Sequence, residues 1–539
     1  MINVEYKKLN NYNNVKIFME NNPDIKPKGK NKTLTYIVIV IVLVAIIGGG
    51  LAYHFITQPS KPPTQTITIA APVYGSSSTV WTNFINNATK SWQASHPNVT
   101  IKFVGPSGAS SEGQYYTKLD LMTASSSTAP TIMLEDMFYT ATYQSEGILA
   151  PLNKLVNSTT FSNVFPSALG QMTINGTHYG LPTQVTDTLI YYNITLLQNA
   201  GVIGPHNTTW QPTNWTQIIN AAKLVKTKFG SSVIPLNVYE GVKADEASSF
   251  TSFETLLYGT GYGLYNFSNS KWYGNNPGLN ETLTFYHQVF SEGLAQSSLS
   301  STPYVTVGQY MQQGKLAIAI DGSWMYGYQW APGAQHPINN FSKYVGVAYT
   351  PTFNGAAPHY NSMVGGWGWS MYNGTKDKAL AASFMLALDN TTNQITLNLP
   401  GGALAGGLPT SKNAVNNSDF KNLMPTDPAL DTFYTNALKY GSYRPPVAAY
   451  PKVSALLQTA MGNVVSGGYT VSHALSTYQS SLNSTVGSGS VQSIPSVSNS
   501  YTPFNGINAK YTNSNDSSNY AIFMYLNEPT LETYFNIFW

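Results

Sequence analysis

The longest apolar run of the chain lies near its start, at residues 36–56 (YIVIVIVLVAIIGGGLAYHFI). At a rise of roughly 1.5 Å per residue, this run spans about 30 Å, the thickness of the hydrocarbon core of a bilayer. Lysines occupy every second position from Lys26 to Lys32, whereas the residues after the run are nearly neutral. The positive-inside rule therefore predicts one transmembrane helix, with residues 1–35 in the cytoplasm and the large remainder outside the cell.

The N-terminal segment also has a second interpretation, as a processed signal. A Lys28-Gly29 pair precedes the apolar run and resembles the processing site of pilin-like signals. The run is long for an ordinary secretory signal, and no Ala-x-Ala-like cleavage site accompanies it. A permanent anchor is therefore favoured, and cleavage remains the alternative.

Beyond a proline-rich spacer at residues 57–65, short apolar runs alternate with amphipathic segments. Apolar side chains at near-helical spacing, among them Trp81, Phe84 and Ile85, indicate a helix that ends before Pro97. The first five expected elements are a strand at 66–75, a helix at 80–96, a strand at 99–105, a helix at 115–126 and a strand at 129–136.

This β-α-β-α-β order predicts an α/β fold with a parallel, doubly wound sheet, in which ligands bind outside the carboxyl ends of the strands. The alternation continues beyond residue 180 and through 344–390, which indicates a second α/β unit. Residues 484–539 are rich in Ser, Asn, Thr and Gly before an aromatic end, so we expect a weakly ordered tail there.

Composition narrows the classes of function. Charged residues are only 9% of the 539 residues, the net charge is +3, and Arg444 is the only arginine. A nucleic-acid partner is therefore not expected, because its phosphates call for a clustered basic surface. The chain has no cysteine, which excludes disulfides and thiolate metal sites, and its eight histidines are dispersed, so we expect no metal.

Many Asn-x-Ser/Thr sequons follow the apolar run and agree with an external domain. A glycan coat would keep so uncharged a surface soluble, although a chain rich in Asn, Ser and Thr also makes sequons by chance. They begin at Asn87, Asn98, Asn157, Asn175, Asn193, Asn207, Asn214, Asn266, Asn280, Asn340, Asn373, Asn390, Asn416, Asn483 and Asn515.

Several segments between residues 66 and 482 occur in a recognisable order. They are PNVTI at 97–101, APTIMLEDMFYTATYQSEGILAPLNKLV at 129–156, GTHYGLPTQVTDTLIYYNITLLQNAGV at 176–202, PTNWTQIINAAKLV at 212–225, YMQQGKLAIAIDGSW at 310–324, GGWGWSM at 365–371, GGLPTSKNAV at 406–415 and YRPPVAAYPKVSALLQTAM at 443–461. Together they resemble the family 1 extracellular solute-binding proteins, which include maltose- and trehalose-type receptors. Thr131 departs from the family pattern, which usually has Asp there.

The resemblance implies a fold and partners. The fold would be the two-lobed, clamshell-like periplasmic-binding-protein fold, with hinge strands between the lobes and the transmembrane helix ahead of them. The partners would be two permease subunits and the ATPase of an ABC importer. We expect lobe one at 66–182 and 352–412, and lobe two at 187–350 and 420–482.

The resemblance implies that the protein captures a small polar solute, and the side chains available favour a sugar. Sugar sites combine flat aromatic faces with carboxylates and amides that bind hydroxyls, and the chain is 13% aromatic. Positions at the ends of strands in the family pattern are the candidates, although most aromatic residues of any chain belong to its core. The candidates are Tyr74, Ser76, Glu135, Asp136, Thr186, Asp187, Trp324, Gly366, Trp367 and Arg444.

Other functions remain as alternatives. A surface adhesion or structural glycoprotein would use the tail and glycans more than a cleft. Within the receptor class, the solute could be a peptide or a polyamine, although a polyamine calls for several carboxylates. A glycoside hydrolase would need two facing carboxylates, such as Glu135 or Asp136 with Asp187 or Asp321. No catalytic motif supports an enzyme or a cofactor, and the Gly308 to Lys315 stretch lacks the spacing of a P-loop.

Overall fold

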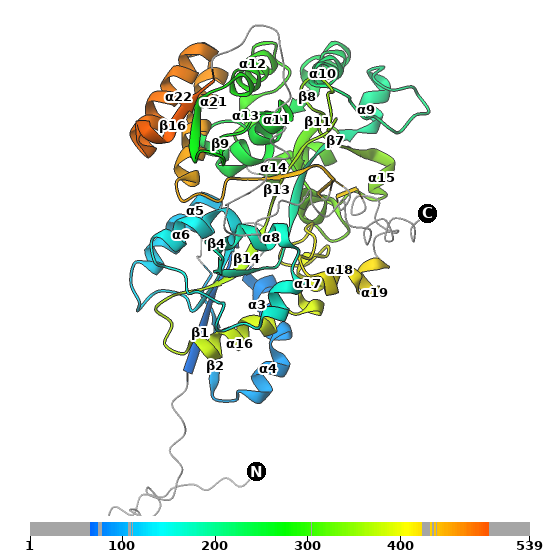
Figure 1. The fold of residues 1–539 in the computed structure, drawn as a ribbon. Helices are drawn as coiled ribbons and strands as arrows, with labels where there is room; N and C mark the ends of the chain where they lie inside the picture. The colour runs from blue at the N-terminus through cyan, green and yellow to red at the C-terminus, as the bar shows by residue number, and fades with distance from the viewer. Residues whose placement is uncertain are drawn as a thin grey trace, which may run out of the picture. The chain divides into compact units, whose positions relative to one another are not determined.

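The computed structural model describes residues 65–73, 78–105, 109, 112–302, 304–422, 432–433, 436–437 and 439–494. Within these residues the chain forms two α/β lobes, each built on its own sheet (Figure 1). No helix in this part of the chain is both long and apolar enough to cross a membrane. The predicted transmembrane segment at 36–56 and most of the proline-rich spacer lie outside the described residues.

The first lobe contains a five-stranded sheet in the order β2-β1-β3-β14-β6. As predicted, β1 pairs in parallel with both β2 and β3. β14, with which the chain returns to this lobe from the second one, is antiparallel to both of its neighbours, β3 and β6. The strands are β1 (Gln65–Ala70), β2 (Val99–Phe103), β3 (Ile132–Asp136), β6 (Gly180–Pro182) and β14 (Trp367–Met371).

Helices cover this sheet with apolar faces. The helix expected at 80–96 is interrupted at Thr89, whose hydroxyl donates to the carbonyl of Ile85. Trp81, Phe84 and Ile85 are buried against the sheet as their spacing predicted. The elements are α3 (Ser78–Ala88), α4 (Lys90–Ser95), α5 (Glu112–Thr123), η2 (Met137–Tyr139), α6 (Thr140–Ser145), α7 (Ser158–Asn163), α8 (Pro166–Gln171), β4 (Thr173–Ile174), β5 (Thr177–His178), α16 (Lys378–Leu388) and α17 (Thr391–Asn398).

The second lobe has a six-stranded sheet with the long strand β7 at its centre. β7 is antiparallel to β11 on one side and to β12 and β13 on the other, and every residue from Thr186 to Tyr192 is buried. The strands are β7 (Thr186–Asn193), β8 (Ile234–Asn237), β11 (Leu316–Gly322), β12 (Val345–Ala348), β13 (Ser362–Gly365) and β15 (Gly441–Tyr443).

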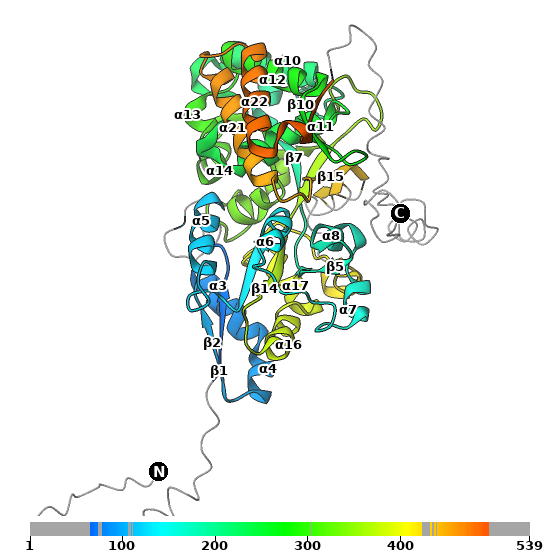
Figure 2. The ribbon, with the colours of Figure 1, turned by 60° about the vertical axis from the view of Figure 1, so that its left-hand side comes forward.

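The helices of the second lobe pack on this sheet, and α12, α21 and α22 lie side by side in both views (Figures 1 and 2). The helices are α9 (Ile194–Asn199), α10 (Trp215–Phe229), η3 (Gly230–Ser232), η4 (Val242–Ala244), η5 (Ala247–Glu254), α11 (Thr255–Gly259), α12 (Pro277–Ser291), α13 (Ser297–Ser300), α14 (Tyr304–Gln312), η6 (Tyr326–Trp330), α15 (Phe341–Tyr344), α21 (Tyr450–Val465) and α22 (Val471–Val486). Two short helices, α18 (Lys412–Asn416) and α19 (Ser418–Lys421), follow α17 of the first lobe and precede β15 of the second.

Three segments carry the chain between the two sheets, and they are hydrogen-bonded to one another. The amide of Gln184 donates to the carbonyl of Trp367 (3.1 Å), and Val185 exchanges two backbone hydrogen bonds with Leu408 (2.8 and 2.7 Å). Gln184 and Val185 belong to the first of these segments and Leu408 to the third. The second passes through Gly366, between β13 and β14. β13 pairs with β7 in the second sheet, so the range 352–412 predicted for lobe one includes a strand of the second lobe.

The expected tail also begins later than residue 484. α22 continues to Val486, and a short strand β16 (Val491–Ser493) pairs in parallel with β10 (Lys271–Asn275). Val486 and Val491 pack against the core of the second lobe, which explains why a polar-looking stretch is ordered here. A two-residue strand β9 (Tyr265–Asn266) and the turn η8 (Ser488–Ser490) complete this edge. The remainder of the expected tail lies outside the described residues.

Candidate ligand-binding site

A cavity of about 140 Å³ lies where the two lobes meet. The first lobe contributes residues that follow the carboxyl ends of its parallel strands, which is the usual ligand position in such sheets. The second lobe contributes both of its π-helical segments, η5 and η6, a rare conformation that is frequent at functional sites. The lining residues are Pro72, Glu112, Asp136, Gln184, Thr186, Lys243, Ala244, Asp245, Glu246, Ala247, Phe250, Tyr304, Val305, Trp324, Met325, Tyr328, Gln329, Gln335, Trp367, Ala403, Leu404 and Arg444.

Trp324 forms part of an aromatic wall of the cavity. Its indole lies directly on the backbone at the end of β11, since a Cβ atom on Gly322 would come within 2.1 Å of the ring. Phe250 stacks against the indole (6.2 Å between centroids, 23° between planes), and Tyr304 meets it edge-on at 5.6 Å. The indole Nε1 is buried and has no hydrogen-bond partner among the described residues, so one donor of this wall is left for a ligand.

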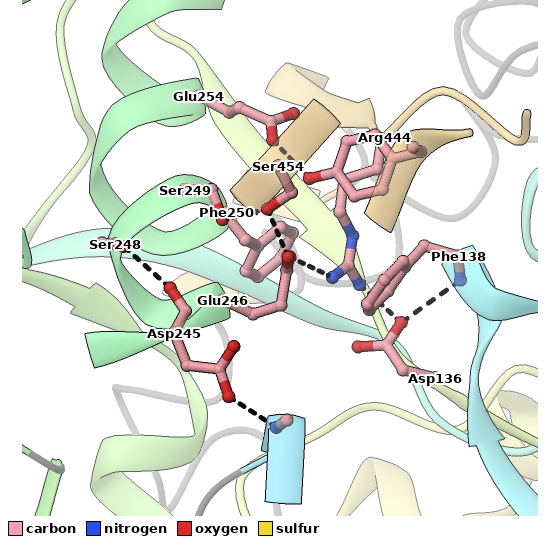
Figure 3. Close-up of polar contacts among 12 residues, drawn as sticks. Asp136, Phe138, Asp245, Glu246, Ser248, Ser249, Phe250, Glu254, Arg444 and Ser454 are labelled. Carbon is pink, nitrogen blue, oxygen red and sulfur yellow. Dashed lines mark hydrogen bonds and ion pairs between the residues drawn. The ribbon is translucent and has the colours of Figure 1, made fainter. Parts of the chain in front are cut away.

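Arg444 joins the two lobes at the cavity (Figure 3). Its guanidinium donates to Asp136 of the first lobe (2.5 Å) and to Glu246 of the second (3.3 Å). The group lies between the rings of Phe138 and Phe250, at 4.0 and 4.3 Å from their centroids. The side chain is only 3% exposed. Two ion pairs and two aromatic faces therefore hold this cation in one position.

Glu246 of these ion pairs and two further carboxyl groups, those of Asp245 and Glu112, line the same part of the cavity. Burial raises the pKa of Glu246 to about 7 although Arg444 lowers it, and Ser454 donates a hydrogen bond to its carboxylate. Asp245 accepts a hydrogen bond of 2.5 Å from the amide of Gly113, at the start of α5 in the other lobe. Burial and then the negative charge of Asp136 raise the pKa of Glu112 well above its usual range.

Five of the ten residues expected to bind ligand line the cavity. Asp136 and Trp367 do so from the first lobe; Thr186, Trp324 and Arg444 do so from the second. Tyr74 and Ser76 lie outside the described residues. That these five bind the ligand remains a prediction.

Glu135, Asp187 and Gly366 are enclosed elsewhere. Glu135 points to the opposite side of β3 from Asp136, as strand alternation requires, and accepts hydrogen bonds from Ser370 (2.6 Å) and Thr140 (3.1 Å). Asp187 accepts a hydrogen bond of 2.6 Å from Asn436. Gly366 lies against the backbone of Gln184 at the crossing between the lobes.

The carboxyl groups considered for a glycoside hydrolase do not form a facing pair in the cavity. Asp321 is fully buried and accepts hydrogen bonds from the Tyr239 hydroxyl and the Gly322 amide, both at 2.8 Å. Glu135 and Asp187 are also enclosed away from the cavity. Of the four carboxyl groups considered, only that of Asp136 therefore lies on the cavity wall. In the described part of the chain, no group of three or more His, Asp or Glu side chains is arranged to hold a metal ion.

Several cavity residues are not among those predicted from the sequence. Glu112 begins α5, and Asp245 and Glu246 lie in a turn before η5, so none of them ends a predicted strand. A signal was nevertheless present, because an adjacent Asp-Glu pair is uncommon in a chain with only 9% charged residues. Phe250, Tyr304 and Tyr328 could not be told from core aromatics by pattern alone.

Comparison with known proteins identifies the family. Residues 74–394 match the family model for bacterial extracellular solute-binding proteins. The chain is 24% identical to a lactose-binding protein of Rhizobium radiobacter over 244 residues, which are 45% of this chain and 53% of that protein. It is also 24% identical to a candidate binding protein of Brucella abortus over 178 residues, 33% of this chain and 40% of that one. The chain thus spans about half or less of the length of these curated relatives.

A solved structure agrees with the fold. The GacH receptor of Streptomyces glaucescens, determined unliganded and with acarbose, superposes with a TM-score of 0.63 at 19% identity, covering 79% of this chain and 99% of that one. At this identity the likeness concerns the fold, which is the two-lobed α/β fold expected from the sequence motifs. The family model covers more than half of the chain, and the chain belongs to the family of bacterial extracellular solute-binding proteins.

Proposed function

We propose that this protein is the external receptor of an ABC importer, that it captures a sugar between its two lobes, and that it delivers the sugar to permease subunits driven by an ATPase. The observation that carries the proposal is the cavity between the lobes, with aromatic side chains and unpaired polar groups on its walls. Such walls suit a solute that has both C–H faces and hydroxyl groups. The names of the lactose-binding relative and the acarbose-binding receptor agree with this class of ligand.

Closure of the lobes around the solute would supply the affinity. Polar contacts already cross from one lobe to the other, namely Arg444 with Asp136, Asp245 with Gly113, and the Thr142 hydroxyl with the Ala448 carbonyl (3.0 Å). The hydrogen-bonded crossing segments provide a hinge about which the lobes can rotate. A solute that contacts both walls would stabilise the closed arrangement over an open one.

The proposal includes the position of the protein in the cell. The helix expected at 36–56 would anchor the chain, with residues 1–35 inside the cell and the two lobes outside. Glycans attached at the sequons would coat the lobes. This is supported by the exposure of the sequon asparagines, none of which is buried in the described ranges. By contrast, fully buried asparagines such as Asn237 and Asn436 lie outside sequons.

The test is a ligand titration of the full-length chain in detergent, followed by tryptophan fluorescence, because Trp324 and Trp367 line the cavity. We expect saturable binding of a sugar at micromolar or lower concentration, and a loss of at least tenfold in affinity in Trp324→Ala. Trp92→Ala is the control, since Trp92 packs on Phe384 away from the cavity. If a folded protein binds no sugar but binds a peptide, the proposed solute class is wrong. If it binds no solute at all, the result favours the alternative of a surface adhesion or structural glycoprotein.

A further inference from the structure

The cavity between the lobes is small for a ligand site. Its volume is about 140 Å³. A protein cavity of about 150 Å³ holds one benzene molecule, which is a single six-membered ring. Pockets that enclose larger organic ligands have volumes of roughly 300–1,000 Å³. The space between the lobes therefore has room for one six-membered ring and none for a second.

Residues that line this cavity also join the two lobes to each other. Asp136 of the first lobe forms its ion pair of 2.5 Å with Arg444 of the second. The hydroxyl of Tyr328, in η6 of the second lobe, donates to the carbonyl of Ala403 in the first (2.9 Å). All four of these residues lie on the cavity wall. The cavity therefore ends where the lobes already touch, and a longer solute would have to break such contacts to lie between them.

Backbone atoms of the two lobes approach closely beside the cavity. A Cβ atom added to Gly327, next to Tyr328, would come within 2.4 Å of the backbone nitrogen of Gly406. A Cβ atom added to Gly113, at the start of α5, would lie 2.3 Å from the carboxylate of Asp245. Glycine at these two positions lets the lobes come this close. Because the boundary includes backbone here, it cannot retreat by a change of side-chain rotamer alone.

The wall offers a single sugar ring both kinds of contact that it needs. Trp324 and Trp367 present aromatic side chains to the cavity, and such faces stack on the C–H faces of a ring. The Nε1 of Trp324 and the Oε1 of Glu112 are shut off from solvent and have no hydrogen-bond partner among the described residues. A hydroxyl group can both donate and accept, so it suits either atom. Two hydroxyl groups of one ring would satisfy them.

We propose that the solute is a monosaccharide, a single sugar ring enclosed by both lobes, and that the contacts between the lobes at Arg444 and Tyr328 exclude a second ring. This proposal rests on the proposed function as a sugar receptor and adds the length of the sugar. A disaccharide can bind only while the lobes stay apart. It therefore gains nothing from the closed arrangement, whereas a monosaccharide stabilises that arrangement by touching both walls.

The experiment compares single sugars with disaccharides. The full-length chain in detergent is titrated by calorimetry with glucose, galactose and mannose, and with maltose, trehalose and lactose. We expect one monosaccharide to bind at least tenfold tighter than every disaccharide. The methyl glycosides of that monosaccharide should bind at least tenfold more weakly than the free sugar, because an enclosed ring leaves no room for an added methyl group.

A change in the wall tests the size limit itself. Tyr328→Ala removes an aromatic ring from the cavity wall together with the contact to Ala403. We expect the preference for the monosaccharide over the disaccharides to fall at least tenfold in this variant. Tyr344→Ala is the matched control and should keep the preference, since Tyr344 lies on α15 of the same lobe, is 42% exposed and is not among the residues that line the cavity.

The outcomes separate this inference from the proposed function. A disaccharide that binds as tightly as every monosaccharide, or an unchanged preference in a folded Tyr328→Ala, overturns the single-ring inference and leaves the sugar receptor standing. Binding of a peptide or a polyamine in place of every sugar overturns both. If Tyr328→Ala does not fold by circular dichroism, the comparison of free sugars, methyl glycosides and disaccharides on the unaltered protein still decides the inference.

Discussion

Asp136 and Arg444 form an ion pair of 2.5 Å between side chains that are only 9% and 3% exposed. They lie 308 positions apart in the chain and belong to different lobes, so the pair exists only when the lobes are together. Glu246 on the other side of the guanidinium makes the contact a bridge of three groups. Closure and charge balance are thus coupled at one arginine.

Replacing this arginine should open the protein rather than unfold it. In Arg444→Met, Asp136 and Glu246 lose their shared cation and repel each other across the cavity. Breaking a buried pair costs roughly 3–5 kcal/mol, and the lobes can avoid that cost by separating. We therefore expect ligand affinity to fall at least 100-fold while the thermal unfolding temperature changes little.

Calorimetric titration and small-angle scattering on the full chain would test this prediction. Scattering should report a larger radius of gyration in Arg444→Met than in the unaltered protein. Lys452→Met serves as the control, because Lys452 is exposed on α21 and makes no ion pair with another described residue within 4 Å. Unchanged affinity in Arg444→Met would show that the bridge has no part in holding the closed state.

A methyl group at Gly322 should disturb the aromatic wall without touching a ligand. The added Cβ would lie 2.1 Å from the indole of Trp324, so the ring must move off β11. We expect Gly322→Ala to weaken ligand binding at least tenfold and to shift the tryptophan emission spectrum. Gly170→Ala is the matched control, since nothing lies within 4 Å of its added methyl group. Equal affinity in the two variants would mean that Trp324 does not act in binding.

Gly366 should be needed for the crossing itself. Its φ is +153°, and an added Cβ would come within 2.0 Å of the carbonyl oxygen of Gln184, in the neighbouring crossing segment. The added Cβ is fixed to the backbone of residue 366, and the atom it would meet belongs to the backbone of Gln184. The two crossing segments would therefore have to move apart to relieve the clash. We expect Gly366→Ala to lower the urea concentration at half-unfolding and to reduce yield, whereas Gly170→Ala should not. A variant as stable as the unaltered protein would contradict the close packing of the crossings.

The sequence predicted the layout better than the orientation of side chains. Short apolar runs separated by amphipathic helices are local patterns, so the β-α-β-α-β order was confirmed in the first lobe. The sequence could not show whether Glu135 or Asp136 faces the cavity. Since β3 is buried on both faces, its residues lack the polar and apolar alternation that would distinguish the two faces. The carboxyl cluster around Arg444 depends on residues from α5, from the turn before η5 and from β3 that come together only after the lobes close.

Acidic conditions should stabilise the folded protein. Glu135, Asp187 and Glu254 are fully buried with hydroxyl or amide partners, and burial raises the pKa of each to about 8. In the unfolded chain such groups titrate near 4. The folded state therefore binds more protons between these two values, so its extra stability is complete below about pH 4 and is lost as the pH rises through 8.

The effect is large enough to measure. Because a tenfold difference in proton affinity corresponds to about 1.4 kcal/mol, ionising each of the three groups costs the folded state on the order of several kcal/mol. Urea unfolding at pH 5 and pH 8 should give the higher free energy of unfolding at pH 5. Glu135→Gln keeps a hydrogen-bonding side chain of the same size but cannot ionise, so it should reduce the difference. Stability that stays level or increases from pH 5 to pH 8 would mean that these carboxyl groups are ionised in the folded protein and paired in some other way.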